Sequence, residues 1–145
     1  MTIHIIKLSV GSESIEGLAE WQATRLEQRR RAREPIETWH RTRMFPRRKS
    51  EVLDGGSIYW VIRGLVLVRQ RIIDLRAVIG EDGISRCDII YDPKLVPVRP
   101  VPRRPFQGWR YLAPADAPPD LSALGGGLDD IPAKMRAELA ELGLI

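Results

Sequence analysis

Short apolar runs bounded by glycine dominate the middle of the chain. Residues 58–62 read IYWVI and residues 65–68 read LVLV, and both runs are too short for buried helices and rich in strand-forming side chains. A glycine pair, Gly55 and Gly56, precedes the first run, and Gly64 separates the two runs as expected for a sharp bend. The pattern therefore predicts two strands that meet at Gly64 and lie at the centre of the fold.

Alternation along these strands assigns their side chains to two faces. In the first strand Trp60 shares a face with the isoleucines on either side of it. In the second strand Val68 and Gln70 lie on one face, whereas Leu67, Arg69 and Arg71 lie on the other. The second strand is therefore expected to have an apolar side and a side that becomes basic halfway along.

Weaker patterns flank this centre. The isoleucine-rich segment 2–10 predicts a strand, and apolar positions three or four apart after Ser12 or Ser14 predict a long helix to about Ala32, with Gln22 interrupting its apolar stripe. Extended segments are expected at 36–44, 84–91, 96–105 and 106–112, with a short helix at 46–53 and a hairpin turn at 80–83. Prolines confine the third of these segments to a sheet edge or a polyproline conformation. The fourth, dense in aromatics, is either a closing strand or a loop over a pocket.

These elements predict an α+β fold, with a curved, mostly antiparallel sheet that closes toward a barrel, a long N-terminal helix and a C-terminal helix. Residues 1–121 are expected to form a single domain, which is long enough to bury a core. Residues 122–145 are expected to form a flexible glycine linker and a helix that packs on the domain or on a partner chain.

The charge of the chain is unevenly distributed. The net charge is +4, and 19 of the 23 cationic residues are arginines. The segment 25–49 contains ten basic and three acidic residues, whereas the segment 113–145 has a net negative charge. Arginine suits bidentate contacts to phosphate, although codon usage in a G·C-rich genome produces the same bias.

Aromatic rings interleave with guanidinium groups between Thr38 and Lys49, a combination that suits stacking on bases and neutralisation of phosphates. We therefore predict a basic-aromatic face that binds nucleic acid or another anion. Its candidate residues are Trp39, His40, Arg41, Arg43, Arg47, Trp60, Arg63, Arg69, Arg71, Arg104, Gln107, Trp109 and Arg110. The alternative is an ordinary sheet with its aromatics in the core and its arginines in solvent.

Specific catalytic signatures are missing from the sequence. We predict no catalytic residue, no metal site and no cofactor, because the spacings of His, Cys and acidic residues match no ligand set and the glycines lack a P-loop lysine. The lone Cys87 excludes an intramolecular disulfide. The N-terminus does not resemble a signal peptide and no apolar run is long enough to span a membrane, so a cytoplasmic location is expected.

Four segments, TRMFPRR, DGGSIYWVIRG, RQRIIDL and RRPFQGWRYL, resemble a bacterial family of small proteins of unknown function. More distantly, the order of features is similar to that of PUA-like domains, which include the ASCH and EVE modules. That resemblance implies a small barrel that binds RNA or modified bases, but it transfers no binding residue.

Three functions remain open from the sequence. The leading hypothesis is an RNA- or nucleotide-binding module that uses the basic-aromatic face. The second is a small enzyme acting on a phosphorylated or nucleotide-like substrate, with a carboxylate or His40 at the floor of a deep pocket. The third is a structural protein that forms a homodimer through its C-terminal helix.

Overall fold

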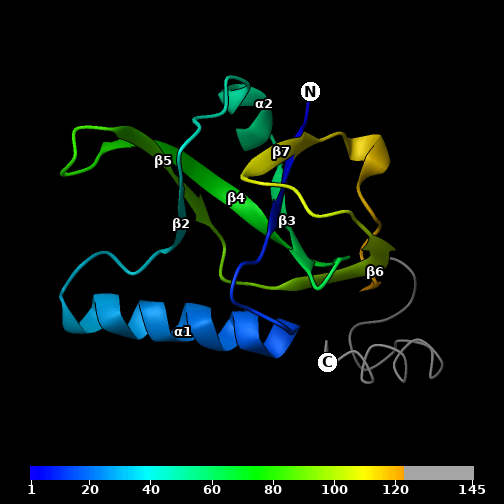
Figure 1. The fold of residues 1–145 in the computed structure, drawn as a ribbon, viewed down its shortest axis with the longest axis horizontal. Helices are drawn as coiled ribbons and strands as arrows, with labels where there is room; N and C mark the ends of the chain where they lie inside the picture. Colours follow the sequence, from blue (N-terminus) through cyan, green and yellow to red (C-terminus); the bar gives the residue numbers. More distant parts are fainter. Residues whose placement is uncertain (123–145) are drawn as a thin grey trace.

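A computed structural model describes residues 1–122 of the chain as a mixed α/β fold with a seven-stranded sheet. The strands are β1 (His4–Leu8), β2 (Thr38–Thr42), β3 (Ser57–Ile62), β4 (Leu65–Ile79), β5 (Ser85–Tyr91), β6 (Val96–Pro102) and β7 (Trp109–Leu112). The helices of this described part are α1 (Ile15–Arg31) and α2 (Lys49–Leu53), with a 3-10 turn at Pro114–Asp116. Figure 1 shows α1 and α2 on opposite sides of the strands.

The sheet is organised around β4. Hydrogen bonding orders the strands β2-β5-β4-β3-β1-β7, and β6 pairs with β4 outside this path. The first half of β4 pairs with β3 and β6, and its second half pairs with β5. All strand pairs are antiparallel except β1 with β3. The 15-residue β4 therefore joins the two halves of the sheet.

The predicted closure toward a barrel is wrong, because the sheet stays open between its edge strands β2 and β7. These edges nevertheless contact each other through the segment that follows β2. Trp109 Nε1 donates to the Met44 carbonyl at 2.9 Å, and the backbone N–H of Arg48 donates to the Tyr111 hydroxyl at 3.1 Å. Side chains, rather than a ladder of backbone hydrogen bonds, hold the two edges near each other.

Two apolar clusters form on the two faces of the sheet. Ile58, Trp60 and Ile62 of β3 belong to the larger cluster, as alternation predicts. Tyr59 and Val61 belong to the smaller cluster on the other face. Since both faces of β3 are buried, its run of apolar residues is continuous.

A bulge changes the alternation in β4. The register shifts between Trp60 and Val61 where β3 pairs with β4, and between Val66 and Val68 where β6 pairs with β4. As a result Leu67 and Val68 both pack in the larger cluster, although alternation predicts opposite faces for them. The pattern of apolar residues contains no sign of this bulge, because every residue near it is apolar.

The helix α1 begins at a capping serine. The Ser14 hydroxyl accepts a hydrogen bond from the Gly17 N–H at 3.0 Å, which satisfies a backbone donor at the helix start. Ile15, Leu18 and Gln22 are the buried residues of this helix. Gln22 is only 4% exposed, so its amide needs polar partners inside the protein.

Gln70 of β4 provides those partners. Its Oε1 accepts from Gln22 Nε2 at 2.8 Å and from Trp60 Nε1 at 2.9 Å. Its Nε2 donates to Gln22 Oε1 at 2.8 Å and to the Asp92 carbonyl at 3.1 Å. Gln70 is fully buried, and both ends of its amide are satisfied. One side chain thereby joins α1, β3, β4 and the turn after β5.

The proline-rich segment forms the strand β6, which pairs only with β4 among the described strands. Its position outside the main path of the sheet agrees with the expected edge strand and explains why its prolines are tolerated. The predicted glycine linker and C-terminal helix, from residue 123 onward, lie outside the described residues.

Removing the buried amides tests the role of this network. We expect Gln70→Leu to lower the free energy of unfolding by about 2–4 kcal/mol, because it leaves Gln22 and the Trp60 N–H buried without partners. Gln22→Leu is expected to cost about 1–3 kcal/mol. The double variant should lose clearly less than the sum of both, as measured by urea unfolding. Strictly additive losses would show that the two amides do not act together.

Candidate functional site

A cavity of about 410 Å³ lies where the two edges of the sheet approach each other. Its walls come from β1, from β2 and the residues after it, and from β7 with the loop before it. The lining residues are Lys7, Arg41, Thr42, Arg43, Met44, Gln107, Gly108 and Trp109. Three of these eight residues are cationic and none is acidic, so the electrostatic field in the cavity favours an anion.

Lys7 lies in a row of side chains that crosses three strands. It pairs in register with Trp60 of β3 and with Trp109 of β7, and residues paired in this way point to the same face. The stem of Lys7 is therefore flanked by two indole rings, both of which are buried. Burial lowers the pKa of Lys7. Among the described residues no carboxylate forms an ion pair with it.

Arg41 and Arg43 differ in how their charges are used. Arg41 holds Asp88 of β5 in a bidentate pair, with Nε–Oδ1 at 2.7 Å and Nη2–Oδ2 at 3.0 Å. Arg43 is exposed and makes no ion pair with any residue in the described range. Arg43 and Lys7 are therefore the lining cations whose charges remain available to a ligand.

His40 is half-buried on the face of β2 that points toward the core. Its ring meets Trp60 edge to face, with centroids 5.6 Å apart. Burial, together with the nearby charges of Lys7 and Arg25, lowers the pKa of His40 to about 4. His40 is therefore neutral near pH 7, and it adds no positive charge beside the cavity.

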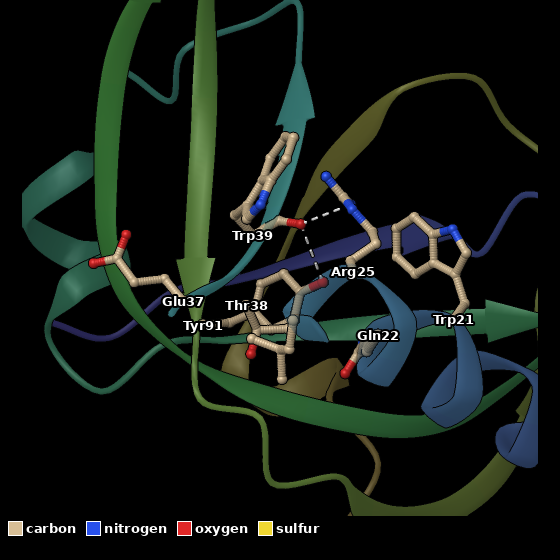
Figure 2. Close-up of a pocket in the computed structure, with 8 residues that line it drawn as sticks. Trp21, Gln22, Arg25, Glu37, Thr38, Trp39 and Tyr91 are labelled. Atoms are coloured by element: carbon tan, nitrogen blue, oxygen red, sulfur yellow. Dashed lines mark hydrogen bonds between the residues drawn. The ribbon is translucent and has the colours of Figure 1, made fainter. Parts of the chain in front are cut away.

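Trp39 does not line the cavity; it lines a much smaller pocket beside α1 (Figure 2). Arg25 lies between the indoles of Trp39 and Trp21, with its guanidinium carbon 3.7 Å and 4.6 Å from the two ring centroids. Its Nη1 also donates to the Trp39 carbonyl at 3.0 Å, and the Tyr91 hydroxyl lies near the same oxygen at 3.5 Å.

The surroundings of Trp39 leave little room for a ligand. The small pocket offers about 10 Å³, which is the space of a single water molecule. Arg29 and Arg41 add two further guanidinium groups within 4.7 Å and 5.4 Å of the Trp39 ring. Arg25 already lies at stacking distance over the Trp39 ring, so the predicted stacking of a base does not fit this ring as it is placed.

The predicted basic-aromatic face does not form one continuous surface. Trp60 is 2% exposed, and its N–H is bound to Gln70, so it cannot stack on a ligand. Arg69 forms a bidentate pair with Asp120, with both N–O distances at 2.7 Å. Arg110 lies over the Phe106 ring at 5.0 Å, on the face opposite to Trp109.

The other predicted cations are exposed at separate places. Arg63 lies in the turn between β3 and β4 with a positive φ of 49°, and Arg71 lies on β4. Arg47 precedes α2, and Arg104 lies in the loop between β6 and β7. Of the thirteen predicted residues, the cavity brings together Arg41, Arg43, Gln107 and Trp109.

Sequence reasoning missed the other lining residues, and Lys7 is the most important of them. Ile3, just before β1, alternates with Ile5 and Lys7 of that strand, and the two isoleucines are buried. A lysine that follows two buried isoleucines on the same face is itself a sign of a half-buried amine. The sequence does not show which face is buried, because Ile6 on the opposite face is equally apolar.

Residues 1–122 contain neither a metal-binding cluster nor a membrane-spanning helix. No group of three or more His, Cys, Asp or Glu residues in this range is placed to hold a metal ion. No helix in the same range has the length and apolar character needed to cross a membrane.

Comparison with known proteins identifies a family but no activity. A family model described as a protein of unknown function, DUF1489, matches residues 5–145, so the chain belongs to that family. Membership of a family of unknown function is thereby confirmed, whereas a relationship to PUA-like domains is not shown. Neither a curated protein nor a solved structure matches the chain.

The depressed pKa of His40 predicts how stability depends on pH. The folded state resists protonation of His40 down to about pH 4, whereas the unfolded chain takes up a proton near the ordinary value of 6.5. The stabilisation is therefore complete above pH 6.5 and is lost as the pH falls toward 4.

We expect the native protein to lose about 2 kcal/mol more than His40→Gln does between roughly pH 7 and pH 5, in urea unfolding at each pH. His4 and the carboxylates are common to both proteins, so the difference isolates His40. Parallel pH profiles for the two proteins would contradict a buried neutral His40.

Proposed function

We propose that this member of the DUF1489 family binds a nucleotide unit in the cavity between its edge strands, either as a free nucleotide or as an unpaired residue of an RNA. The observation that carries the proposal is a space of about 410 Å³ whose eight lining residues include three cations and no acid. Small-molecule sites typically have volumes of about 300–1,000 Å³, so one nucleotide is a ligand of suitable size.

The phosphate is bound by the cations that lack acidic partners. Lys7 approaches from β1 and Arg43 from the end of β2, so a phosphate between them gains two charge-assisted contacts. Arg41 keeps its bidentate contact with Asp88 and contributes mainly to the field in the cavity. The half-buried setting strengthens these contacts relative to the same contacts in open solvent.

The base and sugar lie against the uncharged part of the lining. Trp109 and Met44, joined by the hydrogen bond between the two edges, supply apolar surface. Gln107 carries both a donor and an acceptor and can read the edge of a base. Most of the Trp109 ring is covered by the protein, so its remaining surface acts as a wall rather than as a stacking platform.

The two other hypotheses receive less support. An enzyme on a similar substrate was expected to have a carboxylate or His40 at the floor of its pocket, and neither lines this cavity. Dimerisation through the C-terminal helix stays a prediction, because that segment lies outside the described residues.

The proposal is tested by titrating the protein with adenosine 5′-monophosphate, adenosine and inorganic phosphate in a calorimeter. We expect the nucleotide to bind more tightly than either fragment. Arg43→Gln should weaken nucleotide binding by roughly 10- to 100-fold, the effect of losing one hydrogen bond to a charged group of about 1.5–3 kcal/mol. Arg104→Gln is the matched control, because Arg104 is exposed and lies outside the cavity. Equal affinities for nucleotide and nucleoside would refute a phosphate site.

Titration with a short single-stranded RNA distinguishes the two possible ligands, a free nucleotide and an unpaired nucleotide of an RNA. If the natural ligand is RNA, Arg47 and Arg104 outside the cavity will also contribute, and the affinity will fall steeply with salt. A free nucleotide should show a shallower salt dependence and no effect of Arg104→Gln. Binding of neither ligand at low salt would remove the proposed function.

A further inference from the structure

Lys7 is unusual among the lysines of this chain. The chain contains four lysines, and the three within the described range are Lys7, Lys49 and Lys94. Lys49 and Lys94 are exposed, whereas Lys7 is half-buried between two indoles at the wall of a cavity large enough for a small molecule. A charged amine placed in this way loses hydration, and no described carboxylate compensates for the loss.

The environment of Lys7 destabilises the charged form of its amine relative to a lysine in solvent. Lys7 is half-buried at the wall of the cavity, and this burial lowers the pKa of its amine. A larger fraction of Lys7 is therefore unprotonated near pH 7 than of a lysine in solvent. An unprotonated amine has a free lone pair on Nζ, which makes it a nucleophile toward carbonyl carbon.

We propose that Lys7 is a nucleophilic residue whose Nζ condenses with the carbonyl group of a phosphorylated aldehyde or ketone bound in the cavity. The phosphate would contact Arg43, and the carbonyl carbon would lie within reach of Nζ. The choice of a phosphorylated carbonyl compound rests on the proposed anion site. The reactivity of the amine rests on the burial of Lys7 alone.

The reaction is a condensation that balances without an oxidant or a reductant. The lone pair of Nζ forms a bond to the carbonyl carbon while the carbonyl π bond breaks toward oxygen, and one amine proton passes to that oxygen to give a carbinolamine. The C–O bond then breaks, and the hydroxyl leaves with the second amine proton as water, which gives an imine between Nζ and carbon. The products are one imine and one water, and hydrolysis reverses the reaction.

The test uses pyridoxal 5′-phosphate and pyridoxal, which lacks the phosphate; because pyridoxal also forms an internal hemiacetal, the labelling of Lys7 by each aldehyde is compared with that of Lys49 and Lys94 by the same aldehyde. Sodium cyanoborohydride reduces the imine by delivering hydride to carbon, and this traps the adduct for peptide mass spectrometry. We expect pyridoxal 5′-phosphate to label Lys7 several times faster than Lys49 or Lys94 in the same molecule near pH 7. The two exposed lysines serve as internal controls for the intrinsic reactivity of a lysine toward the aldehyde.

Two further measurements separate the amine from the anion site. Arg43→Gln should slow labelling of Lys7 by pyridoxal 5′-phosphate but not by pyridoxal, and an excess of adenosine 5′-monophosphate should protect Lys7. If the preference for Lys7 over Lys49 and Lys94 is the same with both aldehydes, the amine is reactive and its phosphorylated substrate is refuted. If Lys7 reacts no faster than Lys49 and Lys94 in a folded protein that still binds the nucleotide, the inference fails and the proposed function survives.

Discussion

The buried amide of Gln70 is the constraint on which the interior of this fold depends. An amide with no exposed surface destabilises the protein by about 1–3 kcal/mol for each unsatisfied group, so its partners cannot move independently. Gln22, Trp60 and the Asp92 carbonyl are those partners, and they belong to three different elements. Trp60 in turn lies beside Lys7 in the sheet. The hydrogen bonds of Gln70 that position α1 therefore also fix Trp60, the indole beside Lys7.

Acidic partners determine which arginines are available for function. Bidentate or networked pairs engage several arginines with carboxylates, namely Arg41–Asp88, Arg69–Asp120, Arg76–Glu37, Arg76–Asp74 and Arg86–Asp82. Most of these carboxylates lie far from their arginines in the sequence, so composition alone overstates the free positive charge. The net charge of +4 does not say which cations can bind a ligand. Lys7 and Arg43 can, because no described carboxylate pairs with them. Affinity for an anion therefore depends on these unpaired cations and not on the basic composition of the whole chain.

Local features of the fold were predictable from the sequence, and long-range ones were not. Ser14 marks the start of α1, and Gly64 marks the turn between β3 and β4, because helix caps and positive φ angles have strong residue preferences. The bulge at Val66–Val68 was not predictable from the sequence, because a continuous apolar run gives the same pattern in either register. Closure of the sheet was also undetermined, because strand patterns do not specify whether the two edges pair.

The assembly of the candidate site was likewise not predictable from the sequence, because its residues come from strands that are distant in the sheet. Arg43 and Trp109 come from opposite ends of the strand order, and the Trp109–Met44 hydrogen bond joins the edges at a single point. A complete ladder between β2 and β7 would place their backbones about 5 Å apart and leave no room for a ligand. Contact through side chains holds the edges near each other while a cavity remains open between them. The failure of the sheet to close is thus the structural condition for the site, and an amine on β1, next to the edge strand β7, becomes accessible because of it.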